Sequence, residues 1–115
     1  MVERLFDGRA LINGARVHAG DGQTFDCISP VDGRLLTTVA RCGPADVDAA
    51  VAAARAAFDD KRWCGLAPAA RKRIMIKFAD QLLAHADELA MTETLDMGKP
   101  IQYARNVDVN SAANC

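Results

Sequence analysis

The chain has 115 residues, which is enough for one modest domain and less than two domains usually need. Its 14 Lys and Arg residues nearly balance 15 Asp and Glu residues, and the formal net charge of -1 excludes a general electrostatic attraction to nucleic acid or to an anionic membrane. Hydrophobic residues make up 50% of the chain, but only 5% are aromatic and many are alanine. This composition predicts a globular, helix-rich protein whose core is packed from small side chains.

The cellular compartment is inferred from the absence of a membrane span and of a signal peptide. No stretch approaches the roughly 20 uninterrupted apolar residues of a membrane span, and residues 1–7 carry charges without an apolar signal core. The four cysteines are too widely spaced for a Cys-x-x-Cys ligand or redox pair. We therefore expect a cytoplasmic protein with reduced cysteines, and neither a membrane nor a nucleic acid as partner.

Two β-hairpins are predicted over about residues 9–40. In residues 11–17 an Asn-Gly pair stands between apolar flanks, which is a strong hairpin signal because both turn positions tolerate a positive φ. The β-favouring runs 24–28 and 34–39 are joined through a Pro-Val-Asp-Gly turn at residues 30–33.

Three or four helices are predicted over about residues 44–115, because the apolar spacing changes after Gly43. Pro44 and Pro68 each fit the first turn of a helix, where the missing N–H costs nothing. The second helical region extends to Asp96, with an interruption near residues 85–87, and stops before Gly98. The apolar stripes that would be buried are Val47, Ala50, Val51, Ala54 and Phe58 in the first helix, and Ile74 or Met75, Phe78, Leu82 and Ala86 in the second.

A last helix is predicted to start at Pro100 and to continue to Cys115. It shows no glycine, proline or basic last turn that would satisfy its final carbonyl groups. We therefore expect the chain to be cut rather than finished.

No catalytic or cofactor-binding residue is predicted from the residues alone. The Gly20-Asp21-Gly22 segment lacks the third glycine of a dinucleotide fingerprint and lies between two strands, which favours a surface turn. His85 could in principle reach Cys115, but neither has a visible orienting group. Asp96 and Asp108, which lie near helix ends, are the carboxylates most expected to have a role beyond solvation, although nothing in the sequence pairs them.

Residues 93–100, Glu-Thr-Leu-Asp-Met-Gly-Lys-Pro, resemble the Glu-Thr-x-Asp-x-Gly-Lys-Pro motif of the NAD(P)-dependent aldehyde dehydrogenases. The resemblance covers about residues 5–115. Other matching segments are the opening hairpin at 11–14, the Ser-Pro-x-x-Gly turn at 29–33 and the first helix at 46–58. Within the family, residues 66–69 and 95–101 are most similar to the γ-glutamyl-γ-aminobutyraldehyde dehydrogenase type.

The resemblance implies an α/β parent fold, in which residues 1–115 form the N-terminal part of the nucleotide-binding region and the remainder of the enzyme is absent. It implies oxidation of an aldehyde to a carboxylic acid with NAD or NADP through a cysteine thioester. The catalytic and cofactor-binding residues would then lie beyond residue 115, and this fragment alone would be inactive. The implied partners are the rest of its own polypeptide, a small aldehyde and further copies in a homo-oligomer. The alternative is a stand-alone, non-catalytic protein-interaction module.

The resemblance also implies a site for a monovalent cation, Na+ or K+. Some members of the family hold such an ion through backbone carbonyls before the Ser-Pro turn and an aspartate after Gly-Lys-Pro. By position these are the C=O groups of Cys27 and Ile28 and the carboxylate of Asp108, and oxygen ligands of this kind suit a hard cation.

Overall fold

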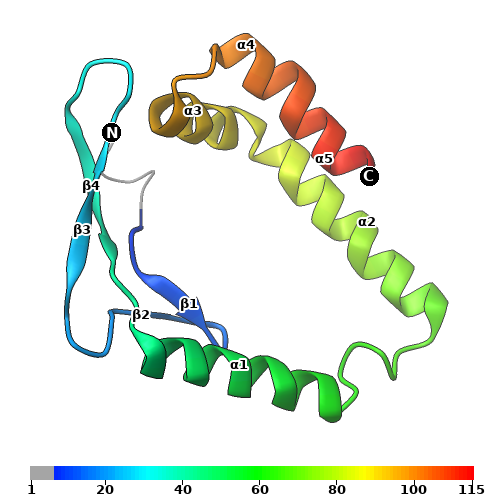
Figure 1. The fold of residues 1–115 in the computed structure, drawn as a ribbon. Coiled ribbons are helices and arrows are strands. Elements are labelled where there is room, and N and C mark those ends of the chain that lie inside the picture. Colours follow the sequence, from blue (N-terminus) through cyan, green and yellow to red (C-terminus); the bar gives the residue numbers. More distant parts are fainter. Residues whose placement is uncertain (1–6) are drawn as a thin grey trace.

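The structure is a computed structural model and describes residues 7–115. Four short strands are followed by a series of helices (Figure 1). The strands are β1 (Ala10–Ile12), β2 (Ala15–Val17), β3 (Thr24–Ile28) and β4 (Leu35–Ala40). The helices are α1 (Pro44–Asp59), α2 (Pro68–Ala84), α3 (Ala86–Met97), α4 (Ile101–Tyr103), the π-helix η2 (Ala104–Val109) and α5 (Asn110–Asn114).

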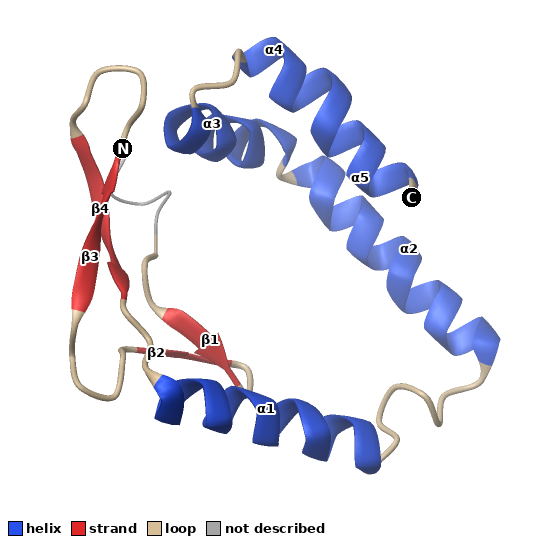
Figure 2. Cartoon of the chain, viewed as in Figure 1, coloured by secondary structure: helices blue, strands red, loops and turns tan. Residues whose placement is uncertain are grey.

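The strands form two separate antiparallel hairpins, as predicted (Figure 2). In the first, Ile12 pairs with Ala15 around Asn13 and Gly14, whose φ angles of 51° and 77° are those of a type I′ turn. In the second, β3 pairs with β4, and the register shifts between Cys27 and Ile28.

The first helix is fixed at its start by one carboxylate. Pro44 occupies the first turn, and Asp46 accepts the N–H of Gly43 at 2.9 Å. The other carboxylate oxygen of Asp46 accepts the N–H of Gly20 at 3.0 Å. Asp46 therefore satisfies a free donor at the helix N-terminus and also ties α1 to the turn that precedes β3.

The second and third helices are separate, and the break lies at His85, within the predicted interruption. Gly98 ends α3 in the left-handed conformation with a φ of 76°, and its N–H donates to the C=O of Thr94 at 3.0 Å. This confirms the predicted glycine stop, since a residue without Cβ adopts this φ at little cost.

The last helical run differs from the prediction. It starts after Pro100 and continues to Asn114, but residues 104–109 form a π-helix rather than a regular α-helix. Ala104 and Val109, five residues apart, are both buried in this segment. A regular helix advances about 100° per residue, so it would place two such residues about 140° apart. The π turn brings both to the same face.

The described chain is open rather than compact. Figure 1 shows the hairpins, α1 and α2 arranged around a wide gap, with α3 and the last helical run together at one end. The Cα radius of gyration is 17.0 Å, whereas a compact chain of this length has a value of about 13 Å. The buried hydrophobic residues among those described are Ala19, Leu36, Ala90, Ala104 and Val109.

The predicted apolar stripes of α1 and α2 are therefore present but largely unpartnered. Val51 and Phe58 are 61% and 64% exposed, and Phe78 of α2 is also exposed. The prediction that these stripes are buried is wrong for most of their residues in the described chain, because the contacts of α1 with β1 and of α2 with α3 and α5 cover only part of each stripe. Among residues 7–115, no helix combines the length and the apolar character needed to cross a membrane.

Candidate functional site

The motif at residues 93–100 forms the last turn of α3 and the connection to α4. Gly98 reverses the chain direction, and Lys99 and Pro100 lead into the last helical run. The side chains of this motif contact both the second hairpin and η2. The motif therefore connects the second hairpin with α3 and η2.

Lys99 is the centre of one of these contacts. Its ammonium group lies 2.9 Å from Oε1 of Glu93 on α3 and is also paired with the carboxylate of Asp108 on η2. All three side chains are partly buried, with exposed fractions of 28% to 37%. The hydrogen bonds to Asp108 and then to Glu93 raise the pKa of Lys99 above its ordinary value, so the ammonium stays charged.

Asp96 makes the other contact, to the second hairpin. The thiol of Cys27 on β3 donates to Oδ1 of Asp96 at 3.2 Å. This hydrogen bond, together with partial burial, raises the pKa of the Cys27 thiol above its ordinary value. A thiol held in its protonated form is a poor nucleophile, so Cys27 is here a hydrogen-bond donor and not an activated cysteine.

Both hairpins and α3 border an open cleft of about 500 Å³ next to this contact. Its lining includes the charged residues Asp7, Arg9, Arg16, Glu88 and Asp96. Arg9 pairs with Asp7 at 2.7 Å and holds the pKa of that carboxyl well below its usual range. The cleft thus carries charges of both signs, and two of them already neutralise each other.

The residues predicted for a monovalent cation lie on two elements that are distant in the sequence. Cys27 and Ile28 are at the end of β3, where the strand register is irregular, and Asp108 is on η2. The carboxylate of Asp108 is already balanced by Lys99, so an ion at this carboxylate would compete with the ammonium. The carboxylate that contacts Cys27 is that of Asp96. The cation site stays a prediction.

Metal sites built from side chains are not found in the described part of the chain, where no three His, Cys, Asp or Glu residues are grouped to hold an ion. The turn at Gly20 and Gly22 leads into β3 and not into a helix. Backbone N–H groups at a helix N-terminus, which would cradle a dinucleotide phosphate, are therefore not presented there.

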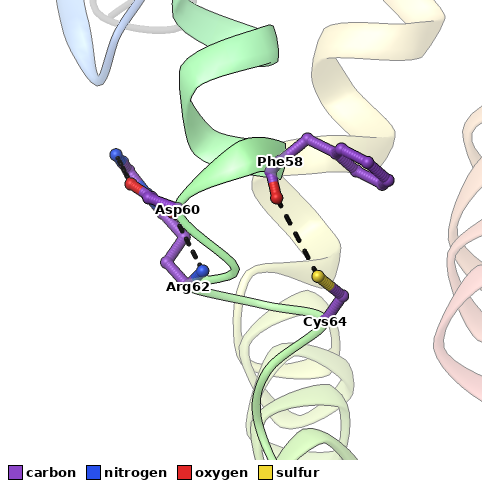
Figure 3. Close-up of polar contacts among 4 residues, drawn as sticks. All are labelled: Phe58, Asp60, Arg62 and Cys64. Atoms are coloured by element: carbon purple, nitrogen blue, oxygen red, sulfur yellow. Dashed lines mark hydrogen bonds and ion pairs between the residues drawn. The ribbon is translucent and has the colours of Figure 1, made fainter.

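The remaining cysteines have no catalytic arrangement within residues 7–115. Cys42, Cys64 and Cys115 are exposed free thiols. Figure 3 shows Cys64 in the turn after α1, where its sulfur faces the C=O of Phe58 at 3.9 Å while Asp60 pairs with Arg62. These contacts close the turn and supply neither a base nor an oxyanion donor. His85 lies 3.2 Å from Glu88 and is engaged locally.

Comparisons with known proteins agree with the motif. The sequence model of the Aldehyde dehydrogenase family matches residues 17–115. The NADP/NAD-dependent aldehyde dehydrogenase PuuC of Escherichia coli is 41% identical over 107 residues, which are 93% of this chain and 22% of PuuC. The chain spans about a fifth of the length of the curated relatives that it matches.

Solved structures are similar over nearly the whole chain. The γ-glutamyl-γ-aminobutyraldehyde dehydrogenase of Burkholderia cenocepacia is 53% identical with a TM-score of 0.93, over 98% of this chain and 23% of that chain. The indole-3-acetaldehyde dehydrogenase AldA of P. syringae, in complex with NAD+ and IAA, is 56% identical with a TM-score of 0.91, over 94% of this chain and 22% of that chain.

Proposed function

The chain belongs to the aldehyde dehydrogenase family, and we propose that the protein that carries it oxidises an aldehyde to a carboxylic acid with NAD+ or NADP+. The match of the family model to residues 17–115 carries this proposal. In such an oxidation the cofactor accepts a hydride from the aldehyde carbon, after a cysteine thiolate has added to the carbonyl. The nucleophile and the cofactor-binding residues are proposed to lie outside residues 1–115.

The role proposed for this chain is structural support of the nucleotide-binding region. The hairpins, about residues 9–40, and the helices, about residues 44–115, would form its N-terminal part. The exposed stripes on α1 and α2 support this role, since helices with an apolar face in α/β proteins cover a sheet or another helix. The working enzyme is further proposed to be a cytoplasmic homo-oligomer.

For the substrate we propose an aldehyde of the γ-glutamyl-γ-aminobutyraldehyde type. Residues 66–69 and 95–101 support this class by their similarity to that type, and a dehydrogenase named for this substrate is among the similar structures. The similarity to an indole-3-acetaldehyde dehydrogenase makes an aromatic aldehyde the competing class.

The test is an assay of the full-length protein as its gene encodes it. We expect NADH or NADPH to form with γ-glutamyl-γ-aminobutyraldehyde at a higher kcat/KM than with indole-3-acetaldehyde. The reverse order would overturn the substrate class and leave the dehydrogenase proposal standing. If no aldehyde of either class gives NADH or NADPH, the interaction module becomes the better explanation. Light scattering of the same sample checks the oligomeric state.

The cation proposal needs a separate test, because two carboxylates could supply the negative charge. Thermal stability of the full-length protein would be measured in NaCl, KCl and choline chloride, for the parent, Asp108→Asn and Asp96→Asn. A cation held by Cys27, Ile28 and Asp108 predicts an ion-specific rise in Tm that Asp108→Asn removes. If only Asp96→Asn removes the rise, Asp108 is not the ligand.

A further inference from the structure

The π-helical turn at residues 104–109 can be compared with a regular α-helix over the same residues. In an α-helix, residues four apart lie about 40° from each other around the axis, so Asp108 rather than Val109 would lie above Ala104. In the structure, Ala104 is 0% exposed and Val109 is 6% exposed, whereas Asp108 is partly exposed. The observed π register therefore buries residue 109, whereas an α register would bury residue 108.

The contacts of η2 favour the register in which residue 109 is buried. The segment packs against α3. Val109 and Asp108 border a cleft of about 300 Å³ that is also lined by Leu82 and Leu89. An apolar side chain at this position loses water contact favourably, whereas an ionised carboxylate there would need a partner.

In the observed register Asp108 has a partner outside this buried position, which is Lys99. Its ammonium bridges Glu93 on α3 and Asp108 on η2 across the turn at Gly98. We propose that Lys99 acts as a register clamp: by holding the Asp108 carboxylate beside Glu93, it keeps residues 104–109 in the π-helical register and so fixes the rotation of α5 about its axis. Lys99 is in this sense a positioning residue.

The clamp has a consequence for the helix that follows. Residues 110–114 continue the same run (Figure 1), so a change from the π to the α register would turn α5 by about one residue, or 100°. Ala112, Ala113 and Cys115 now border an apolar groove against Met75 and Phe78 of α2. Release of the clamp would therefore change which residues of α5 face α2.

The experiment measures how accessible positions 109 and 112 are to a thiol reagent. Single variants Val109→Cys and Ala112→Cys, which both keep Asp108, are made in the full-length protein, with and without Lys99→Met. Modification by N-ethylmaleimide is followed at each position by mass spectrometry. With Lys99 present, the thiol at position 109 should react slowly. Lys99→Met should make it react about tenfold faster. The same change of register would move residue 112 to the place of the partly buried Ala113, so the thiol at position 112 should react more slowly.

The controls separate a register change from loosening. Asp87→Asn removes the ion pair between Asp87 on α3 and Arg105 on η2. This variant should leave the rate at position 109 unchanged. Lys99→Arg keeps a cation and should restore the slow rate. Ala19→Cys, at a buried position remote from the clamp, reports global unfolding.

Other outcomes would overturn the proposal. If Lys99→Met speeds both positions, the segment frays and no register is clamped. If it changes neither, Lys99 does not control the turn. Should Lys99→Met fail to fold, Asp108→Leu provides the same test, because an apolar residue 108 favours the α register and should speed the reaction at position 109. An unchanged rate in that variant would equally contradict the clamp.

Discussion

Gly98 and Gly14 share a positive φ, at 76° and 77°, but differ in their surroundings. A Cβ on Gly14 would meet nothing within 4 Å, whereas one on Gly98 would lie 3.3 Å from Cγ of Pro30. We expect Gly14→Ala to lower the free energy of unfolding by about 1 kcal/mol, which is the conformational cost of this φ. Gly98→Ala should cost more, because the contact with Pro30 is added. Urea unfolding of the full-length variants measures both losses, and equal losses would show that Pro30 moves away freely.

The Cys27 thiol gives a prediction for pH dependence. Its pKa is raised above the ordinary 9.0, first by the hydrogen bond to Asp96. The folded state therefore holds this proton more tightly than the unfolded state, so the contact stabilises the fold below about pH 9 and this contribution is lost as the pH rises through the raised pKa. Iodoacetamide should alkylate Cys27 with a midpoint at higher pH in the folded protein than in guanidinium. Asp96→Asn should lower the folded midpoint. Identical folded and unfolded midpoints would contradict the assignment.

The partners of Asp96 and Asp108 show the limit of prediction for single residues. Both were predicted to do more than face solvent, and both are engaged, one by Cys27 and one by Lys99. The partners could not be predicted, because Cys27 is 69 residues from Asp96 along the chain and the contact depends on how the hairpin lies against α3. The pairing of Lys99 with Asp108 likewise depends on the direction of the chain after the turn at Gly98. The spacing of the two residues in the sequence does not predict it.

At the scale of elements, α1 depends on Asp46, which accepts N–H groups from Gly43 and Gly20. Removing the carboxylate leaves two donors without this partner, and loss of such a cap costs about 1 to 2 kcal/mol. We therefore expect Asp46→Ala to lower the free energy of unfolding by about that amount. Asp48→Ala is the matched control on the same helix, because among the described residues the side chain of Asp48 makes no hydrogen bond to the protein. Equal effects of the two substitutions in urea unfolding would show that the cap contributes nothing.

Elements with local causes were predicted well. The hairpin at Asn13 and Gly14 and the helix stop at Gly98 follow from backbone angles that few residues adopt. The π turn was missed because the contacts of this segment with α3 and with Lys99 are tertiary, and the local sequence does not show them. The sequence does contain a signal for it, the five-residue spacing of Ala104 and Val109, but two small apolar residues in an alanine-rich chain are too weak a pattern to indicate a rare helix type.

At the scale of the molecule, the described chain has an open shape (Figure 1). Its radius of gyration is 17.0 Å and few of its side chains are buried, so we expect residues 1–115 alone to bury too little apolar surface to offset their conformational entropy. The apolar periodicity correctly located the helices. It could not show how far each stripe is covered, because within residues 7–115 α1 contacts mainly β1 and α2 mainly part of α3 and α5, and most of their large apolar side chains stay exposed.

The unpartnered stripe of α1 leads to a prediction that compares two polypeptides. Residues 1–115 alone should bind a hydrophobic dye and unfold without a sharp thermal transition, because the stripe remains in water.

Val51, which is 61% exposed in the described chain, is the position substituted to test this. In the isolated polypeptide Val51→Asp should reduce dye binding and leave the thermal profile unchanged. In the full-length enzyme, where the stripe is proposed to be covered, the same change should lower stability by about 2 kcal/mol or more, since it buries an unpaired charge. Asp48→Asn is the matched control on the same helix. A sharp transition of the isolated polypeptide without dye binding, or a full-length protein indifferent to Val51→Asp, would show that α1 needs no covering partner.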